Sequence, residues 1–544
     1  MVRRRRRSRW SDFWRSTPFY GFLLKGRTPA RLARLVPAPL AGSAARGESI
    51  VGGMLACAGR GLPAERPDWF AAGISDAALD ELNAFEWLDD LAACGTEAAQ
   101  SRARALVEDW IYANPGWRPG AWDPATTGRR LAAWLAHAPF LSRGEGDRFG
   151  PMFLESAARQ ARHLARAAPS APAGVARLAA LCGLVYAQAC GLVSGRDIVA
   201  TAQRLGIEAR RQLLDDGFHA ARGGGAQFEA LTLLTAARGA LEICDAAAPA
   251  DLNSAIDALV PAVRFFRHGD GGFALFENTN SGDPRRIDAV LARAGSAEPA
   301  PASARAAGFE RVAVDRLLLI ADCGAPPGPG FDASAHAGAL SFELSSGRDR
   351  IVVNCGAGPG DSSDWSLALR ATPAHSTLTL EDTSSSEPIP DGLTRRVPHV
   401  EGHRDEVDGN TWLEMKHDGY ARDFGFTHVR RIFVANDGRD VRGEDSLVPV
   451  EGGRVSASAR FAVRFHLAPD LQASIVQNGA AALLRTPSGQ AWRLQAAGAA
   501  LEIGESVSFA ARGMARRSEQ IVAAGTADAR GISVKWAFKR VSDR

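Results

Sequence analysis

The chain has 544 residues, which is too many for one hydrophobic core, so two or three domains are expected. Its hydrophobic fraction of 46% and charged fraction of 23% are ordinary for a globular protein, and a net charge of +3 gives no basis for nucleic-acid binding. No stretch approaches the roughly 20 apolar residues of a membrane-spanning helix. The seven cysteines show no CxxC spacing, which argues against a disulfide framework.

A basic arm, the run of arginines from Arg3 to Arg7, lies near the N-terminus. The residues after it, Trp10 to Arg15, are charged and aromatic and lack the apolar core of an export signal, so no signal peptide is expected. We interpret the arm as a solvated basic tail, with contact to anionic lipid or another polyanion as the less favoured alternative. The rest of residues 1–75 is rich in Pro, Gly and Arg and is predicted to be irregular.

Residues 76–294 carry apolar side chains at helical spacing, as in Asp80 to Leu88 and Phe228 to Ala246. Short breaks that contain Pro, Gly or Asp separate at least eight such segments. Because short loops make antiparallel neighbours, this region is predicted to be an all-helical toroid or bundle.

A linker of Ala, Pro, Ser and Gly, residues 295–308, precedes a region in which the apolar period changes to two. Alternating runs such as Arg316 to Asp322 and Ile532 to Phe538 end at turn residues, which predicts an antiparallel β-sandwich over residues 309–544. The fold class is therefore multidomain α+β, an N-terminal (α/α) toroid of antiparallel helices followed by a C-terminal antiparallel β-sandwich. Ligand sites favour the junction of two such domains.

Residues 335–376 form the most informative stretch of the β-region. His336 and His375 each begin an alternating run, and a run between them ends in Asn354 and Cys355. Side chains alternate between the two faces of a strand, so neighbouring strands can bring both histidines and one of the other two residues onto one face. Such a group suits a metal ion, and the alternative is two strand-end histidines with ordinary hydrogen bonds.

Four ordered segments resemble the heparinase II/III-like polysaccharide lyases, and the resemblance covers most of the chain. In the family these segments read HxHADxLSFEL, LLVDPG, RSTxAHNTV and HDGYxxxFGxxHxR. Their counterparts here are Ser334 to Leu344, Ile351 to Gly356, Arg370 to Leu378 and His417 to Arg430. The resemblance implies the toroid and β-sandwich fold and a β-elimination at a uronic acid.

The resemblance also implies a metal, usually zinc, held by two histidines and an aspartate of the β-domain. His336 and His375 match the histidine ligands, whereas the aspartate position is Asn354, a neutral and weaker oxygen ligand. Zinc at these three residues is the cofactor expectation, and no organic cofactor is expected. Cys355 is a better ligand as a thiolate, but a bulge would be needed to turn it to the face of Asn354.

Elimination requires a group that neutralises the substrate carboxylate, a base for the C5 proton and an acid for the leaving oxygen. In the family a Tyr and a His supply the acid and base, but Ser334 replaces the first His of HxHAD and Ala226 replaces the expected Tyr of a helical-domain segment, GGHxERSxxYH. The remaining catalytic candidates are Tyr420, on a predicted turn, and His219 with Arg222, beside three glycines. Their structural alternatives are a turn-capping tyrosine and a helix-cap ion pair.

The expected partner is an acidic polysaccharide or oligosaccharide, such as a glycosaminoglycan. Arg370 can hold a carboxylate through two hydrogen bonds, or pair with an acid of the sandwich. Trp117 and Trp122 lie in a Pro/Gly loop and can stack on sugar rings. Arg130, near the start of a predicted helix, and His417, beside Tyr420, complete the predicted substrate contacts.

Two functions follow from these patterns. The first is a carbon–oxygen lyase that cleaves a uronate-containing glycan in a cleft between toroid and sandwich. The alternative is a non-catalytic glycan-binding or envelope-associated protein that kept the fold and lost the Tyr and His pair. A hydrolase with paired carboxylates, for which Glu229 and Glu277 are candidates, is weaker. The family commonly works in the periplasm or cell envelope. Because no export signal is recognised, a location in the cytoplasm is expected equally.

Overall fold

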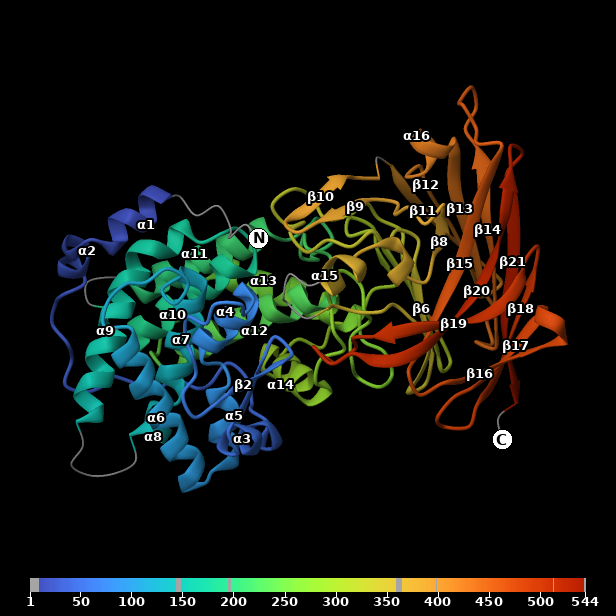
Figure 1. The fold of residues 1–544 in the computed structure, drawn as a ribbon. Helices are drawn as coiled ribbons and strands as arrows, with labels where there is room; N and C mark the ends of the chain where they lie inside the picture. The colour runs from blue at the N-terminus through green and yellow to red at the C-terminus, as the bar shows by residue number, and fades with distance from the viewer. Residues whose placement is uncertain are drawn as a thin grey trace.

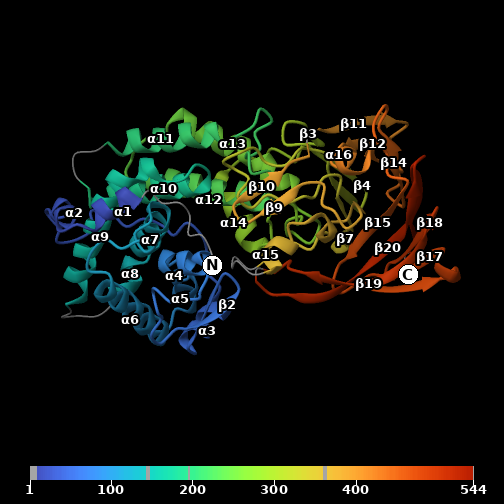
Figure 2. The ribbon, with the colours of Figure 1, turned by 45° about the horizontal axis from the view of Figure 1, so that its top comes forward.

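The structure is a computed structural model, and it describes residues 9–142, 148–193, 197–358, 364–397, 399–511 and 513–542. Helices make up one half of the molecule and sheets the other half (Figure 1). The same two halves lie side by side after a turn of 45° (Figure 2). Within the described ranges, no helix combines the length and the apolar character that a bilayer crossing needs.

The segment before residue 76 differs from the irregular one that the sequence predicts. It contains three helices and a hairpin: α1 (Arg9–Ser16), α2 (Pro18–Leu23), α3 (Ala44–Val51), β1 (Met54–Cys57) and β2 (Arg60–Pro63). Thr17 accepts a hydrogen bond from the Tyr20 N–H and Pro18 is the first helical residue, so α2 begins with a capped turn. Helices this short carry too few apolar repeats for periodicity to reveal them.

The toroid helices follow in chain order: α4 (Asp76–Ala84), α5 (Leu88–Cys94), α6 (Glu97–Ala113), α7 (Pro124–Ala136), α8 (Ala138–Leu141), α9 (Phe149–Ala167), η1 (Ala168–Ser170), α10 (Val175–Ala189), α11 (Ile198–Arg211), α12 (Gly224–Glu242), α13 (Ala250–Phe265) and α14 (Pro284–Ala294). Helix α10 is buried along most of its length and packs against α7 at two glycines. A Cβ on Gly183 would lie 2.3 Å from the carbonyl oxygen of Gly128, so only glycine permits this approach.

The β-half contains two large antiparallel sheets. The eight-stranded sheet has the order β11-β12-β13-β14-β21-β18-β17-β16, and the nine-stranded sheet has the order β19-β20-β15-β7-β6-β5-β4-β3, with β8 also paired to β15. The strands of the first sheet are β11 (Val400–Val407), β12 (Asn410–His417), β13 (Phe426–Val434), β14 (Asp440–Pro449), β16 (Gln472–Val476), β17 (Ala481–Arg485), β18 (Ala491–Ala497) and β21 (Ile532–Ser542). Those of the second are β3 (Ser303–Ala304), β4 (Phe309–Val314), β5 (Leu317–Asp322), β6 (Phe342–Ser346), β7 (Asp349–Val353), β8 (Leu378–Leu380), β15 (Ser458–Leu467), β19 (Ala500–Ser508) and β20 (Arg516–Asp528).

Smaller elements complete the β-half: α15 (Asp364–Ala368), η2 (Thr372–Ala374), β9 (Glu387–Ile389), β10 (Gly392–Arg395), α16 (Ala421–Phe424) and η3 (Gln477–Gly479). The two large sheets face each other across an apolar core, in which the ring of Phe342 stacks on Trp536 with centroids 5.3 Å apart. The predicted fold class, a helical toroid followed by an antiparallel β-sandwich, is confirmed.

Candidate functional site

Arg222 lies at the contact between toroid and sandwich. Its backbone is left-handed, with φ of 62°, and its side chain is buried. The guanidinium donates to Glu277 Oε1 at 3.2 Å and to Asp322 Oδ1 at 2.5 Å. It also donates to the carbonyl of Ala307 at 2.6 Å. Two carboxylates therefore pair with this catalytic candidate, and its bond to Asp322 joins the toroid to the sandwich.

Glu277 joins this cluster to the predicted metal site. Its Oε2 accepts a hydrogen bond from the His336 N–H at 2.9 Å. Burial raises the pKa of this carboxyl to about 7, although the neighbouring Arg222 favours its charged form. Glu277 and Asn278 both have left-handed backbones, with φ of 46° and 56°, so the loop is held in a conformation that side chains other than glycine rarely adopt.

We expect the stability of the protein to depend on pH through Glu277. Its pKa is raised from 4.5 to about 7 in the folded state, so its contribution is present below pH 4.5 and is lost as the pH rises to 7. Relative to Glu277→Gln, the wild type should lose about 3 kcal/mol of unfolding free energy across that range. Denaturant unfolding at several pH values measures this, with the exposed Glu505→Gln as control. Parallel profiles for wild type and Glu277→Gln would contradict it.

His219 is buried beneath the ring of Phe331, with centroids 5.6 Å apart. Its Nδ1 accepts the Ala221 N–H at 3.1 Å, so the ring proton is on Nε2, which donates to Gln212 Oε1 at 3.0 Å. Burial lowers the pKa of this histidine to about 4, so it stays neutral at ordinary pH. Both ring nitrogens therefore hold the loop, and neither is free to take a substrate proton in this conformation.

His336 and His375 lie together, as predicted, on the loops before β6 and β8. His375 Nδ1 donates to the carbonyl of Ala371 at 2.9 Å, which leaves its Nε2 to accept from His336 Nδ1 at 3.0 Å. Burial lowers the pKa of His375 to about 4 and that of His336 well below its usual value. His336 Nε2 is then a buried acceptor without a hydrogen-bond partner in the described part of the chain.

Asn354, the third predicted ligand, forms hydrogen bonds through both polar atoms of its side-chain amide. Asn354 Oδ1 accepts from the Ser376 N–H at 3.0 Å, and Nδ2 donates to Glu343 Oε1 at 3.3 Å. Cys355 faces the other side, where its Sγ lies 3.5 Å from His466 Nδ1. In the described ranges no group of three His, Cys, Asp or Glu residues could hold a metal ion. Asn354, held by hydrogen bonds at both amide atoms, is a poor third ligand, and zinc at these three residues stays a prediction of the resemblance.

Tyr420 and His417 are buried inside the sandwich, and both form hydrogen bonds to other parts of the chain. The Tyr420 hydroxyl donates to the carbonyl of Leu378 at 2.9 Å, and burial raises its pKa well above the usual value. His417 Nδ1 accepts the Gly419 N–H at 3.1 Å, so its Nε2 carries the proton that faces His428 Nδ1 at 3.3 Å. Both side chains are at most 1% exposed, so neither the predicted acid/base nor the predicted substrate contact is open to a polysaccharide here.

The network continues to Asp445, which accepts from His428 Nε2 at 2.8 Å and from Trp536 Nε1 at 2.8 Å. Arg430 binds both of its carboxylate oxygens, at 2.7 and 3.0 Å. These residues come from strands β13, β14 and β21 of one sheet, and Arg430 also donates to the carbonyl of Ser376 at 2.8 Å, near the other sheet. The fourth family segment thus stabilises the sandwich.

The predicted substrate-binding residues are mostly buried. Arg370 donates to the backbone carbonyls of Ala335, Ile389 and Gly392, so it holds loops together. Arg130 is fully buried and donates to Gln160 and to the carbonyls of Asn83 and Ala121.

Trp122 is 2% exposed and packs in the helical core. Only Trp117 keeps part of its surface, because it packs at the edge of that core. The predicted residues are therefore divided among three places: the helical core, the domain junction and the interior of the sandwich.

A cavity of about 690 Å³ lies at the domain junction beside Arg222. Small residues of the segments 305–308 and 323–328 form much of its wall. No tyrosine lines it, and its one histidine, His403, is exposed on β11 and contacts Asp405 at 3.1 Å. The cavity can admit a ligand but offers no Tyr and His pair for elimination.

The outermost surface of the toroid carries a group of exposed aromatic side chains. Phe13, Trp14, Phe19 and Phe22, here called the aromatic quartet, are 67%, 48%, 56% and 66% exposed. They project from α1 and α2, which lie at the end of the toroid far from the sandwich (Figures 1 and 2). The hydroxyl of Tyr20 contacts His163 Nδ1 at 2.7 Å and fixes α2 to helix α9.

Arginines bind the segments next to the aromatic quartet. Arg15 donates to Ser170 Oγ at 3.1 Å, and Arg162 donates to the carbonyls of Leu24 and Arg27. Burial, followed by the charges of Arg159 and Arg166, lowers the pKa of Arg162. Cationic and aromatic groups are therefore concentrated at the same end of the molecule, an arrangement typical of proteins that contact a membrane surface.

Comparison with known proteins agrees with this fold. The model of the family "Heparinase II/III-like, C-terminal" matches residues 297–537. FtsZ-localized protein C of Caulobacter vibrioides is 32% identical over 522 residues, which cover 91% of this chain and 90% of that protein.

Among solved structures, heparinase III has a TM-score of 0.73 at 12% identity, covering 99% of this chain and 93% of its own. A heparan sulfate lyase HepC mutant from Pedobacter heparinus has a TM-score of 0.60 at 15% identity, covering 92% and 83%. At these identities the structural likeness shows the fold alone. From the family match and the long relative together, this chain belongs to the heparinase II/III-like family.

Proposed function

We propose that this protein is a non-catalytic member of the family that binds an anionic membrane surface and associates with FtsZ assemblies. The proposal rests on a difference in solvent exposure between two groups of side chains. The acid–base candidates Tyr420 and His219 are buried and hydrogen-bonded internally, whereas the aromatic quartet is exposed. Elimination needs groups that can reach a substrate, and membrane contact needs apolar side chains that can leave water.

The end of the toroid has the physical properties of a lipid-contacting surface. Aromatic side chains favour the boundary between headgroups and acyl chains, and each buried one contributes about 1.5–3 kcal/mol. The arginine run Arg3 to Arg7 directly precedes α1 in the sequence. Each Lys or Arg close to an anionic bilayer adds about 1 kcal/mol. The arm lies outside the described residues, and its position before α1 in the sequence supports contact with anionic lipid over a merely solvated tail.

The proposed partner comes from the relative in Caulobacter vibrioides, whose name describes localisation with FtsZ. The similarity extends over about nine-tenths of both chains. Co-sedimentation with FtsZ polymers formed with GTP tests this part of the proposal. The protein should enter the pellet in proportion to polymerised FtsZ and stay in the supernatant with GDP. An equal distribution under both conditions would exclude FtsZ polymers as the partner.

A polysaccharide lyase acting on a uronate-containing glycan is the second candidate, and the cavity at the domain junction favours it. Elimination produces an unsaturated uronate with a strong ultraviolet absorbance. We expect no such absorbance when the protein is incubated with heparan sulfate, chondroitin sulfate or alginate, because no Tyr and His pair faces the cavity. Heparinase III is the positive control for heparan sulfate. An absorbance increase that disappears in Glu277→Gln or Arg222→Met would restore the lyase function.

A further inference from the structure

A second cavity lies between the toroid and the sandwich, on the loops that follow α13. It measures about 340 Å³, which is within the range of small-molecule sites. The toroid contributes Asp270, Leu275 and Ser281, and the sandwich contributes the turn before β7 and the start of β20. None of the positions that correspond to the family's acid and base, Ser334 and Ala226, lines this cavity.

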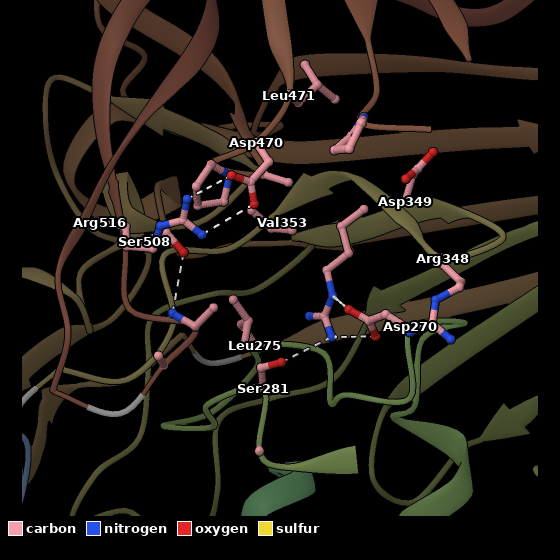
Figure 3. Close-up of a pocket in the computed structure, with 17 residues that line it drawn as sticks. Asp270, Leu275, Ser281, Arg348, Asp349, Val353, Asp470, Leu471, Ser508 and Arg516 are labelled. Atoms are coloured by element: carbon pink, nitrogen blue, oxygen red, sulfur yellow. Dashed lines mark hydrogen bonds and ion pairs between the residues drawn. The ribbon is translucent and has the colours of Figure 1, made fainter. Parts of the chain in front are cut away.

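Three arginines line the cavity, and two of them are held by carboxylates. Arg350 binds both oxygens of Asp270, at 2.8 and 3.0 Å. Arg516 binds both oxygens of Asp470, at 3.3 and 2.7 Å. Figure 3 shows the Arg516–Asp470 pair on one side of the cavity and Asp270 on the other. These pairs fix two planar guanidinium groups with part of their hydrogen-bonding capacity unused.

Arg348 is the third arginine, and it forms no ion pair within the described ranges. The buried carboxylate of Asp349 also lines the cavity, where it accepts hydrogen bonds from Thr486 and Ser488, so three aspartates accompany the three arginines. The guanidinium of Arg348 lies on the same side as Asp270 in Figure 3. Among the arginines of the lining, Arg348 is therefore the one whose guanidinium has no carboxylate partner in the described ranges and can bind a ligand.

The hydroxyl groups of the cavity are also arranged as donors. Ser281 Oγ accepts from Arg350 Nη2 at 3.4 Å, and Ser508 Oγ accepts from the Ala510 N–H at 3.3 Å. A hydroxyl that already accepts keeps its own proton to donate. The two hydroxyls and the guanidinium of Arg348 thus supply donors to the cavity, while Leu275 and Leu471 supply an apolar wall. A ligand that matches it has acceptor oxygens, a negative charge and a small carbon skeleton.

We propose that this cavity binds a small oxyanionic metabolite, a sugar acid or a phosphate ester, through Arg348, Ser281 and Ser508. The proposal does not depend on membrane or FtsZ binding. A ligand here contacts both halves of the molecule at once, so its binding stabilises the junction between toroid and sandwich. A carboxylate and a phosphate both present a negative charge and acceptor oxygens. Separate titrations with one probe of each kind distinguish a sugar acid from a phosphate ester.

Isothermal titration calorimetry of the full-length protein with inorganic phosphate and, separately, with glucuronate tests the proposal. We expect saturable binding of one ligand per chain for at least one probe, with phosphate alone indicating a phosphate ester and glucuronate alone a sugar acid. Arg348→Ala should weaken binding about tenfold or more, since a charge-assisted hydrogen bond is lost. Arg530→Ala, which removes an exposed arginine outside the cavity, should leave it unchanged.

Two results would overturn the proposal. One is the absence of saturable binding for both probes, and the other is equal weakening by Arg348→Ala and Arg530→Ala, which would indicate nonspecific attraction. Because Arg348 is exposed and makes no ion pair with any described residue, its replacement should leave the unfolding temperature unchanged. The double variant Ser281→Ala and Ser508→Ala provides a second measurement that keeps every charge, and it should weaken binding without altering the fold.

Discussion

Replacing Trp14 and Phe22 by glutamate is expected to abolish binding to anionic vesicles. Both side chains belong to the aromatic quartet and are 48% and 66% exposed. If each contributes about 1.5–3 kcal/mol on entering the interface, losing both weakens partitioning by about 10²- to 10⁴-fold. Flotation with vesicles of mixed anionic and zwitterionic lipid measures the effect. Wild-type binding should also weaken as salt is added, because the basic groups act through long-range attraction.

The matched control for this variant is a second exposed apolar pair on the opposite half of the molecule. Trp412 of β12 and Val407 of β11 are 48% and 55% exposed. Their replacement by glutamate introduces the same charge without touching α1 or α2, so vesicle binding should stay near the wild-type level. Equal loss in both double variants would show that net charge, and not the aromatic quartet, determines binding. If the Trp14/Phe22 variant binds vesicles as well as the wild type does, the aromatic quartet is not the lipid-contacting surface.

Replacing Asp445 by alanine is expected to destabilise the protein by about 3–5 kcal/mol, because it leaves the buried charge of Arg430 without a partner. The side chains of Arg430, His428 and Asp445 are all inaccessible to solvent. Burial alone would raise the pKa of Asp445, but the charge of Arg430 and the hydrogen bond from His428 lower it far below the usual range. The stabilisation is therefore present at neutral pH and lost only in strong acid.

Denaturant unfolding followed by tryptophan fluorescence measures this change. The control is Asp528→Ala, which removes an exposed carboxylate whose partner Arg530 is 91% exposed, and it should leave the unfolding free energy nearly unchanged. A similar small loss for Asp445→Ala would mean that the fourth family segment does not hold the sandwich together. The role of that segment would then have to be sought in function.

The sequence was sufficient for the large elements because their apolar side chains repeat with a clear period. Helix α9 and strand β12 have such patterns. Strand β11, an edge strand with no buried residue, reads as Glu, Gly, His, Arg, Asp and Glu and has no apolar alternation. Its formation depends on pairing with β12, which is a tertiary effect that periodicity does not record.

The site was only partly predictable from sequence for a similar reason. The family segments indicated that His336 and His375 lie together, and their ring nitrogens are 3.0 Å apart in the structure. Tyr420 follows a turn sequence that suggests exposure, yet its hydroxyl meets the carbonyl of Leu378, 42 residues away in the chain. The partners of Arg222 are 55 and 100 residues away. Burial and long-range charge pairing decide which residues are available, and one sequence shows neither.

We propose that this protein binds an anionic membrane and FtsZ polymers at the same time. A flotation experiment with anionic vesicles, FtsZ polymers and this protein tests it most directly. FtsZ should float with the vesicles when the wild-type protein is present, and it should remain at the bottom with the Trp14/Phe22 glutamate variant or with no added protein. FtsZ that stays at the bottom with the wild-type protein, while that protein itself floats, would contradict the claim.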